Sequence, residues 1–500
     1  MVIHVHILLT YLRGFHDVVR GALLRSTMEV NWDAILDAPL VSKPTRVAKV
    51  LDAIAGLSSD DGGVIDAPST ACDRGFAYLR AALRESDGTE VLRTKRALRL
   101  FLRWSGRWEA TGGALGGGEA LCCLNNALFR NRVAQRAMVA DRGLVVALAS
   151  LLGDGAAGAD AEATARVCRN LLGLFGVDDA RAALGQLLYI ECALVDRLLP
   201  RLEAGVALLC SAEVGVLEPW PSAEVHRLFI DALQLLNAVA YDLERASPPA
   251  EDRADPAAAG VDSAAAAAAA DADAPSSIFN EDGADDPDSA MSRLGRLVLA
   301  LLLHPRPEEG SPAQLLHHEV HLGVATLLMH MPPRFAHFLV AHGAVGALLT
   351  MLRAQVADAS RAAAEHEAAG RLASTRERLR VAMDGLACAG TACTIVSRES
   401  LAARRTIKAV VFPTDAAAER VAAGGGDAMF SRDAPAGTLR ADLIALMNGA
   451  TFSSSRRVVA ELLYVLCDEN HHEMVARTGV GAAAGLLAAK GLFQGGRLAR

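Results

Sequence analysis

The chain has 500 residues, of which 52% are hydrophobic and 4% aromatic, and its formal net charge is −8 at pH 7. This charge argues against a nucleic-acid-binding protein, which needs a dominant basic surface to displace counterions from phosphates. The longest strongly apolar runs, such as Leu297–Leu303, fall far short of the roughly 20 residues that a membrane-spanning helix requires. We therefore expect no integral membrane segment.

The N-terminus and the cysteines indicate the compartment. Met1–Leu9 is apolar but contains His4 and His6, and it has neither a basic n-region nor a small-residue cleavage site, so we expect no signal peptide. Nine cysteines, an odd number, are scattered from Cys72 to Cys467 and form no compact disulfide framework. This usage fits a reducing cytosol, and we expect a cytoplasmic protein.

The composition favours helix throughout, because Ala, Leu, Val and Arg dominate and long stretches lack the β-branched and aromatic runs that strands prefer. Apolar residues recur at three- and four-residue spacing, for example at Leu144, Leu148, Leu151 and Leu152. A chain of this length can form one long solenoid, since repeat proteins escape the size limit of a single core.

One candidate site is a stripe of basic residues on a predicted helix. Arg96, Arg99, Arg103 and Arg107 stand three or four residues apart, so on a helix they lie along one face. Four like charges in line repel one another, which is unfavourable unless an anion or an acidic partner lies against them. The same spacing is also typical of an ordinary solvated helix face. Spacing by itself leaves both interpretations open.

Two internal echoes then suggest repeats. Ala120–Asn125, followed by Phe129, is echoed by Ala232–Asn237, followed by Tyr241. Both segments place an Asn in mid-helix, where its propensity is poor, so the side chain is expected to be used.

The second echo begins with glycine: Gly143–Leu148 is matched by Gly343–Leu348, and Gly479 opens a third version. In armadillo repeats a glycine makes the sharp turn into the last helix. These observations predict an all-α fold, an α-solenoid superhelix of armadillo/HEAT-type repeats.

The clearest break in composition runs over 247–290. A Ser-Pro-Pro sequence is followed there by an alanine run and then by acidic residues. Such a segment buries little apolar surface and repels itself, so it is expected to be a disordered linker. It would separate N-terminal helical repeats over 1–246 from C-terminal helical repeats over 291–500.

The sequence contains no complete motif for catalysis or metal binding. His317 and His321 share a helix face, but the segment does not match the His-Glu-x-x-His spacing of zinc proteases. Cys388 and Cys393 have no second pair at zinc-finger spacing, and no Lys-Ser or Lys-Thr follows the glycines between 112 and 118. We expect no catalytic residue, metal or cofactor, and a protein that works by binding another protein.

Three C-terminal segments and one N-terminal segment resemble a known family. Thr478–Leu492 closely resembles the hallmark segment of the synembryn family, whose members are chaperones and guanine-nucleotide exchange factors for heterotrimeric G-protein α subunits. Arg456–Cys467 and Leu439–Met447 resemble the two helices before it, and Leu121–Asn126 is similar to the family's Cys-Leu-Cys-Asn helix.

The resemblance implies a right-handed superhelix whose concave face takes the C-terminal helix of a Gα subunit. Withdrawing that helix loosens the loop that holds the guanine base, so GDP leaves without any bond being made or broken. The same grip would steady nascent, nucleotide-free Gα. It implies a non-enzymatic cytoplasmic protein that its partner recruits to the cortex of the plasma membrane.

The resemblance also implies partner-binding residues. Arg99 and Arg103 match two family arginines four residues apart, and Asn126 matches the Asn after Cys-Leu-Cys. A guanidinium suits a carboxylate, and an Asn amide can both donate to and accept from a peptide backbone. Asn237 is included as a fourth such residue, although an ungapped match puts Ala238 where the family has Asn.

Two further expectations concern function. The family continues past the hallmark into an acidic stretch and a helix that touches the Gα switch region, whereas the sequence ends at Arg500, so we expect binding to be better preserved than exchange. The alternative is a generic armadillo scaffold or transport adaptor of the importin type. Such a groove offers repeated Trp-Asn pairs, but none of the four tryptophans here is followed by Asn.

Overall fold

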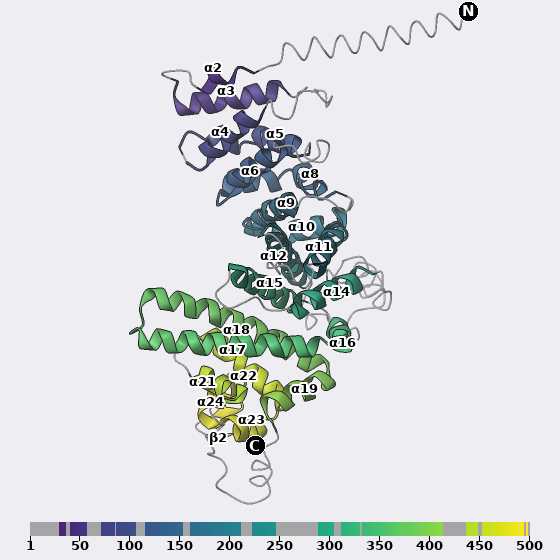
Figure 1. The fold of residues 1–500 in the computed structure, drawn as a ribbon, viewed down its shortest axis with the longest axis vertical. Coiled ribbons are helices and arrows are strands. Elements are labelled where there is room, and N and C mark those ends of the chain that lie inside the picture. The colour runs from purple at the N-terminus through teal and green to yellow at the C-terminus, as the bar shows by residue number, and fades with distance from the viewer. Residues whose placement is uncertain are drawn as a thin grey trace, which may run out of the picture. The chain divides into compact units, whose positions relative to one another are not determined.

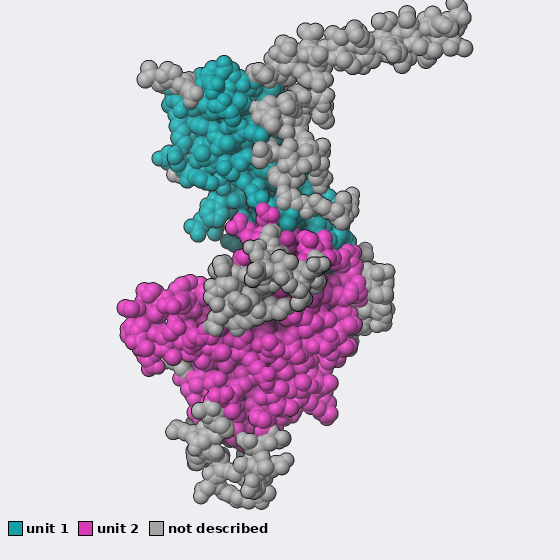
Figure 2. All heavy atoms as spheres, viewed as in Figure 1, with its two compact units in different colours: residues 1–201 teal, residues 202–500 magenta. Residues whose placement is uncertain are grey.

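The structure is a computed structural model that describes residues 30–36, 41–57, 72–85, 87–106, 116–153, 161–211, 223–246, 289–304, 312–330, 333–413, 437–448, 453–494 and 497–498. The chain divides into two compact units, Met1–Arg201 and Leu202–Arg500 (Figure 2). The linker predicted at 247–290 lies almost entirely outside the described residues, so it stays a prediction.

The first unit is helical (Figure 1). Its elements are α2 (Trp32–Leu36), α3 (Lys43–Gly56), α4 (Asp73–Leu83), η2 (Glu90–Arg93), α5 (Lys95–Ser105), α6 (Gly116–Leu128), α7 (Arg132–Val139), α8 (Arg142–Ser150), α9 (Ala161–Leu174), η4 (Asp178–Ala180), α10 (Arg181–Gln186) and η5 (Leu187–Glu191). The boundary residue lies within α11 (Leu194–Ser211).

The second unit is also helical apart from one short hairpin. Its helices are α12 (Ala223–Ala246), α14 (Ala290–Leu303), α15 (Pro312–Leu328), α16 (Pro333–Ala341), α17 (Ala344–Ala368), α18 (Ala373–Glu399), α19 (Leu401–Val411), α21 (Leu439–Asn448), α22 (Ser453–Leu466), α23 (His471–Thr478) and α24 (Val480–Ala489). The strands β1 (Phe493–Gln494) and β2 (Arg497–Leu498) pair antiparallel, with Phe493 opposite Leu498.

Polar residues before several helices satisfy backbone N–H groups that the first turn leaves without partners. Thr94 caps α5, Asn131 caps α7 and Asn470 caps α23. In each case the side-chain oxygen accepts hydrogen bonds from first-turn backbone nitrogens at 2.9 to 3.4 Å. These caps set where the helices begin.

The glycine-led segments agree with the expected turns at two places and differ at one. Gly343 (φ 82°) and Gly479 (φ 83°) both adopt left-handed backbone directly before α17 and α24, as predicted. The prediction for Gly143 is wrong, because this residue lies inside α8. The turn into α8 is made by Asp141, whose extended backbone (φ −114°, ψ 91°) joins α8 to the end of α7.

Helices stack in a row within each unit. In the first unit α6 packs on both α4 and α9, and in the second α15 packs on α12 and α18, while α18 also packs on α22. Hydrogen bonds to backbone carbonyls link neighbouring helices within each row. The Cys123 thiol of α6 donates to the Phe76 carbonyl of α4 at 3.4 Å, and the Ser455 hydroxyl of α22 donates to the Met383 carbonyl of α18 at 3.1 Å. The predicted all-α solenoid class is confirmed. Its superhelical curvature stays a prediction.

An aromatic cluster orients α5 in the first unit. Phe76 of α4 meets Phe101 and Trp104 of α5 in edge-to-face contacts, with ring centroids 6.3 and 5.8 Å apart. All three side chains are fully buried. Because these large rings must face the core, the opposite face of α5 is left to solvent.

The segments that resemble the family form the expected helices, α21, α22 and α24.

The turn between α22 and α23 holds Asp468 (φ 56°) and Glu469 (φ 57°) in left-handed backbone, which is unfavourable for non-glycine residues. Ion pairs offset this cost, since Asp468 binds Lys408 at 2.7 Å and Arg404 at 3.1 Å. These cations hold the pKa of Asp468 below its usual value.

Candidate partner-binding site

The arginines of the basic stripe lie on the exposed face of α5. Arg96, Arg99 and Arg103 point away from the side that buries Phe101 and Trp104. The predicted alignment of these charges is therefore confirmed. The fourth member, Arg107, lies outside the described residues.

Carboxylates of the same unit already neutralise part of this face. Arg99 contacts Asp141 at 2.8 Å, and Lys95 contacts the same carboxylate oxygen at 2.8 Å. One turn away, Arg96 contacts Asp52 at 3.0 Å. The stripe was interpreted either as a solvated face or as an anion-binding face. The structure adds a third interpretation, in which carboxylates of the same unit pair with the basic side chains and offset the repulsion between like charges.

Asp141 is the centre of this arrangement. Its side chain is 18% exposed, whereas that of Arg99 is 60% exposed. Hydrogen bonds from Lys95 and then Arg99 lower the pKa of Asp141 to about 2, so this residue carries a negative charge at all physiological pH values. Sequence reasoning missed Asp141, which stands 42 positions from Arg99 and shares no local pattern with it.

Asn126 is half-buried on α6, and its amide is already engaged. The Nδ2 atom donates to the backbone carbonyl of Arg80 on α4 at 3.3 Å. Arg80 in turn contacts Glu119 of α6 at 2.9 Å. The amide was expected to recognise a peptide backbone, and the backbone that it binds in this structure belongs to the neighbouring helix. A role in partner binding stays a prediction.

Asn237 occupies a comparable position in the second unit. Its Nδ2 donates to the carbonyl of Gly323 on α15 at 3.1 Å, while its buried Oδ1 has no hydrogen-bond partner within the described part of the chain. Asn170 of α9, which sequence reasoning missed, forms a weaker bond of the same kind with the Leu121 carbonyl at 3.5 Å. The expectation that the mid-helix Asn is used is thus met by Asn237, and Asn126 and Asn170 link stacked helices of the first unit in the same way.

The aromatic residues that end the two echoed segments are exposed. Phe129 follows α6 and is 65% exposed, and Tyr241 of α12 is 41% exposed. The Arg130 guanidinium lies 5.1 Å from the centre of the Phe129 ring, and Arg130 itself adopts left-handed backbone (φ 51°). Exposed aromatic side chains next to cations are common in protein interfaces.

The histidines and cysteines differ in their surroundings. The rings of His317 and His321 lie 3.9 Å apart, which confirms that they share a helix face. Across the described residues, no group of three or more His, Cys, Asp or Glu side chains is arranged to hold a metal ion. Cys393 is fully buried, as expected, and burial raises the pKa of its thiol to about 12.

Among the residues that the structure describes, one helix, α18, is long and apolar enough to cross a membrane. The most apolar 18 residues of α18 have a mean hydropathy of 1.4, but 61% of that window is buried inside the protein. The bent pair α16 and α17 also passes this test when both are taken together. Buried core helices have the same properties, so the expectation of no integral membrane segment stays a prediction.

The sequence is similar to one known protein family over most of its length. A sequence model of the family described as guanine nucleotide exchange factor synembryn (Ric8) matches residues 76–497. Shorter stretches resemble Chaperone Ric-8A of Xenopus laevis (50% identity over 60 residues), Chaperone Ric-8A of Mus musculus (49% over 59) and Chaperone Ric-8B of Mus musculus (45% over 60). Each stretch spans 12% of this chain and 11% of the relative. Because the family match covers most of the sequence, the chain belongs to the synembryn family of guanine nucleotide exchange factors.

Proposed function

We propose that this protein binds G-protein α subunits, acts as their folding chaperone and promotes guanine-nucleotide release. The observation that carries the proposal is the family match over 76–497, which includes both the basic helix α5 and the C-terminal helices. The relatives named as chaperones support the folding role. A cytoplasmic location, with recruitment to the membrane cortex by the partner, is part of the same proposal.

The exposed face of α5 is the proposed contact for acidic groups of Gα. A guanidinium carries five N–H donors, so Arg99 can keep its bond to Asp141 and still donate to a carboxylate of the partner. Arg103 lies one turn further along the same face. Asp141 would then hold Arg99 in position and reduce the conformational entropy lost on binding.

Apolar contacts would come from neighbouring elements of the same unit. The exposed ring of Phe129 and the exposed side chain of Val133 lie at the corner between α6 and α7, and both of these helices pack against α5. An amphipathic helix carries apolar and charged residues on adjacent faces, so it matches this combination of surfaces. Asn126 contributes by fixing α6 against α4.

Exchange by such a protein needs no catalytic group. A partner that binds nucleotide-free Gα more tightly than GDP-bound Gα shifts the equilibrium toward GDP release by its difference in affinity. The same preference would stabilise newly made Gα before it takes up nucleotide. The adaptor alternative gains no support from the two tryptophans that the structure describes, because Trp32 and Trp104 are buried and unavailable to a peptide groove.

A pull-down with purified Gα tests the proposal. Immobilised chain is incubated with GDP-loaded Gα and with Gα stripped of nucleotide, and retained Gα is quantified. We expect retention of both forms, with more of the nucleotide-free form. GDP release from Gα is measured in parallel with a fluorescent analogue. If neither form of Gα is retained, the proposal is refuted. If Gα is retained but GDP release is not accelerated, the chaperone role stands and the exchange role is refuted.

A further inference from the structure

Helices α17 and α18 form a long hairpin in the second unit, and the turn between them projects beyond the neighbouring helices α15 and α21 (Figure 1). In this turn Gly370 (φ 66°) and Arg371 (φ 65°) adopt left-handed backbone. The four residues from Arg371 to Ser374 are all exposed, and α18 begins without a side-chain cap. Its first turn therefore opens at lower cost than a capped one, so an enzyme that encloses its target residue can reach this segment.

The exposed segment Arg371–Ser374 has the sequence Arg-Leu-Ala-Ser, which places a guanidinium three residues before a hydroxyl. Arginine-directed protein kinases recognise this spacing, because carboxylates in their substrate groove pair with the arginine while the serine enters the catalytic site. No other Ser or Thr among the 500 residues has an Arg three positions before it. The sequence therefore offers such a kinase a single target.

The hydroxyl of Ser374 is available, whereas that of the next residue is not. The Ser374 side chain is exposed and forms no hydrogen bond within the described part of the chain. Thr375 is only 6% exposed, and its hydroxyl donates to the Leu372 carbonyl at 2.9 Å and lies 2.9 Å from Nδ1 of His366. Of these two neighbouring hydroxyls, only that of Ser374 can act as a nucleophile without the loss of existing bonds.

A guanidinium of the same hairpin can bind a phosphate on Ser374. Arg378 stands four positions after Ser374, so the two are neighbours on the surface of α18, and it now contacts Glu365 of α17 at 3.4 Å. A phosphate carries a charge of about −1.5 to −2 at pH 7 and three acceptor oxygens, so it competes well with a carboxylate for this cation. The nearby carboxylate of Glu377 repels the phosphate weakly, because Arg380 binds it at 2.6 Å.

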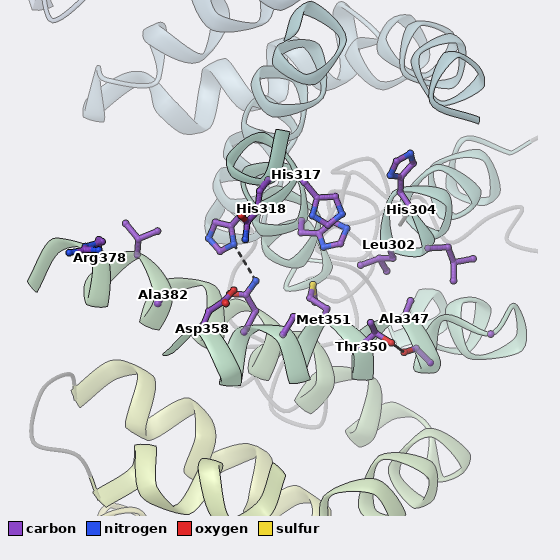
Figure 3. A pocket seen from close by; sticks show the side chains of 18 of the residues that line it. Leu302, His304, His317, His318, Ala347, Thr350, Met351, Asp358, Arg378 and Ala382 are labelled. Carbon is purple, nitrogen blue, oxygen red and sulfur yellow. Dashed lines mark hydrogen bonds between the residues drawn. The ribbon is translucent and has the colours of Figure 1, made fainter. Parts of the chain in front are cut away.

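Arg378 also lines a cavity of about 830 Å³ in the second unit. Four helices form a ring around it: α14 packs on α15, α15 on α18, α18 on α17, and α17 on α14. Figure 3 shows Arg378 at one end of the cavity and His304 at the other. A phosphate that draws Arg378 away from Glu365 would change the charge at this end of the cavity.

We propose that Ser374 is a phosphorylation site for an arginine-directed protein kinase, with ATP as the phosphoryl donor. The Ser374 oxygen bonds to the γ-phosphorus as the bond from that phosphorus to the bridging oxygen breaks, ADP leaves, and the hydroxyl proton passes to a carboxylate of the kinase. The phosphate then binds Arg378 in place of Glu365. The site lies in the second unit and uses none of the residues proposed to contact Gα.

Incubation of the full, folded chain with ATP and the catalytic subunit of cAMP-dependent protein kinase tests the site, with phosphate mapped by tandem mass spectrometry. We expect phosphate on Ser374, and none at this position in Ser374→Ala. Arg371→Asn should lower the initial rate at least tenfold, since it removes the guanidinium but keeps a residue that tolerates left-handed backbone. The matched control Arg376→Asn removes another exposed arginine near the turn and should leave the rate nearly unchanged.

Two results would overturn the proposal. One is a folded parent chain without phosphate on Ser374, whether or not other serines are modified. The other is an equal loss of rate in Arg371→Asn and Arg376→Asn, because the arginine three residues before the serine would then have no special role.

A second arm tests the binding of the phosphate by Arg378. Phosphorus NMR of the modified chain gives the second pKa of the phosphoserine, which is about 6 without a charged partner. A neighbouring guanidinium favours the dianion, so this pKa should lie below about 6 in the parent and rise in Arg378→Ala. The control Arg353→Ala, on the exposed face of α17, should keep the value of the parent. If the parent and Arg378→Ala give the same pKa, the assignment of Arg378 is wrong.

Discussion

Replacing Arg99 and Arg103 together by Ala is the sharpest test of the α5 face. Both side chains are exposed, and the opposite side of the helix is anchored by the buried rings of Phe101 and Trp104. Alanine has a higher helix propensity than arginine, so α5 should persist. The ion pair between Arg99 and Asp141 is lost, but Lys95 still binds the carboxylate at 2.8 Å. We therefore expect a folded protein with a weakened contact for Gα.

The size of the effect follows from the hydrogen bonds at stake. A bond that involves a charged group contributes about 1.5–3 kcal/mol, and contributions from neighbouring residues rarely add fully. Arg99 loses part of its contribution because Asp141 already occupies one of its donors. The double substitution should weaken binding by about 2–4 kcal/mol, which is about a 30-fold to 700-fold rise in Kd.

Fluorescence anisotropy with a labelled peptide of the Gα C-terminal helix measures this change. The matched control is Arg376→Ala with Arg380→Ala on α18, which also removes two exposed arginines four residues apart, together with the ion pairs of Arg380 with Glu377 and Asp384. The control should bind like the parent. If the α5 variant melts normally and binds the peptide with unchanged affinity, the proposed contact is refuted and these arginines form an ordinary solvated helix face.

Three further predictions concern single positions. Cationic neighbours lower the pKa of Asp141 from 3.8 to about 2. The ionised carboxylate therefore stabilises the fold above about pH 4, and this contribution is lost as the pH falls toward 2. The difference in melting temperature between the parent and Asp141→Asn should be present at pH 5 and smaller at pH 3. Asn237→Ala should lower the free energy of unfolding, measured by urea titration, by about 1–3 kcal/mol, because the substitution leaves the Gly323 carbonyl without its donor. The control Gln234→Ala, on the exposed face of α12, should change the free energy of unfolding by less than about 0.5 kcal/mol. Burial raises the pKa of the Cys393 thiol to about 12, so iodoacetamide at pH 8 should alkylate the half-buried Cys122 first, as read by mass spectrometry; equal rates would contradict this order.

Helices could be predicted from sequence because their signals are local. The spacing of Leu144 and Leu148 placed both in the core, and both are buried. Gly343 was expected to turn the chain because a left-handed residue is most often glycine. The same argument failed at Gly143, where Asp141 makes the turn with extended backbone that any residue can adopt. A glycine in a repeated pattern therefore indicates a turn only when the connection requires positive φ.

Local patterns in the sequence were enough to predict the helical class and the exposed face of α5, and the family match confirmed the resemblance. Which groups meet across the helices follows only from the packing of the folded chain. Arg99 pairs with Asp141 42 positions away, and Asn126 donates to a carbonyl 46 positions away. The ring of helices that encloses the cavity joins α14, α15, α17 and α18. Helix periodicity repeats every few residues and can be read locally, whereas these contacts depend on how successive helices stack, which no short stretch of sequence encodes.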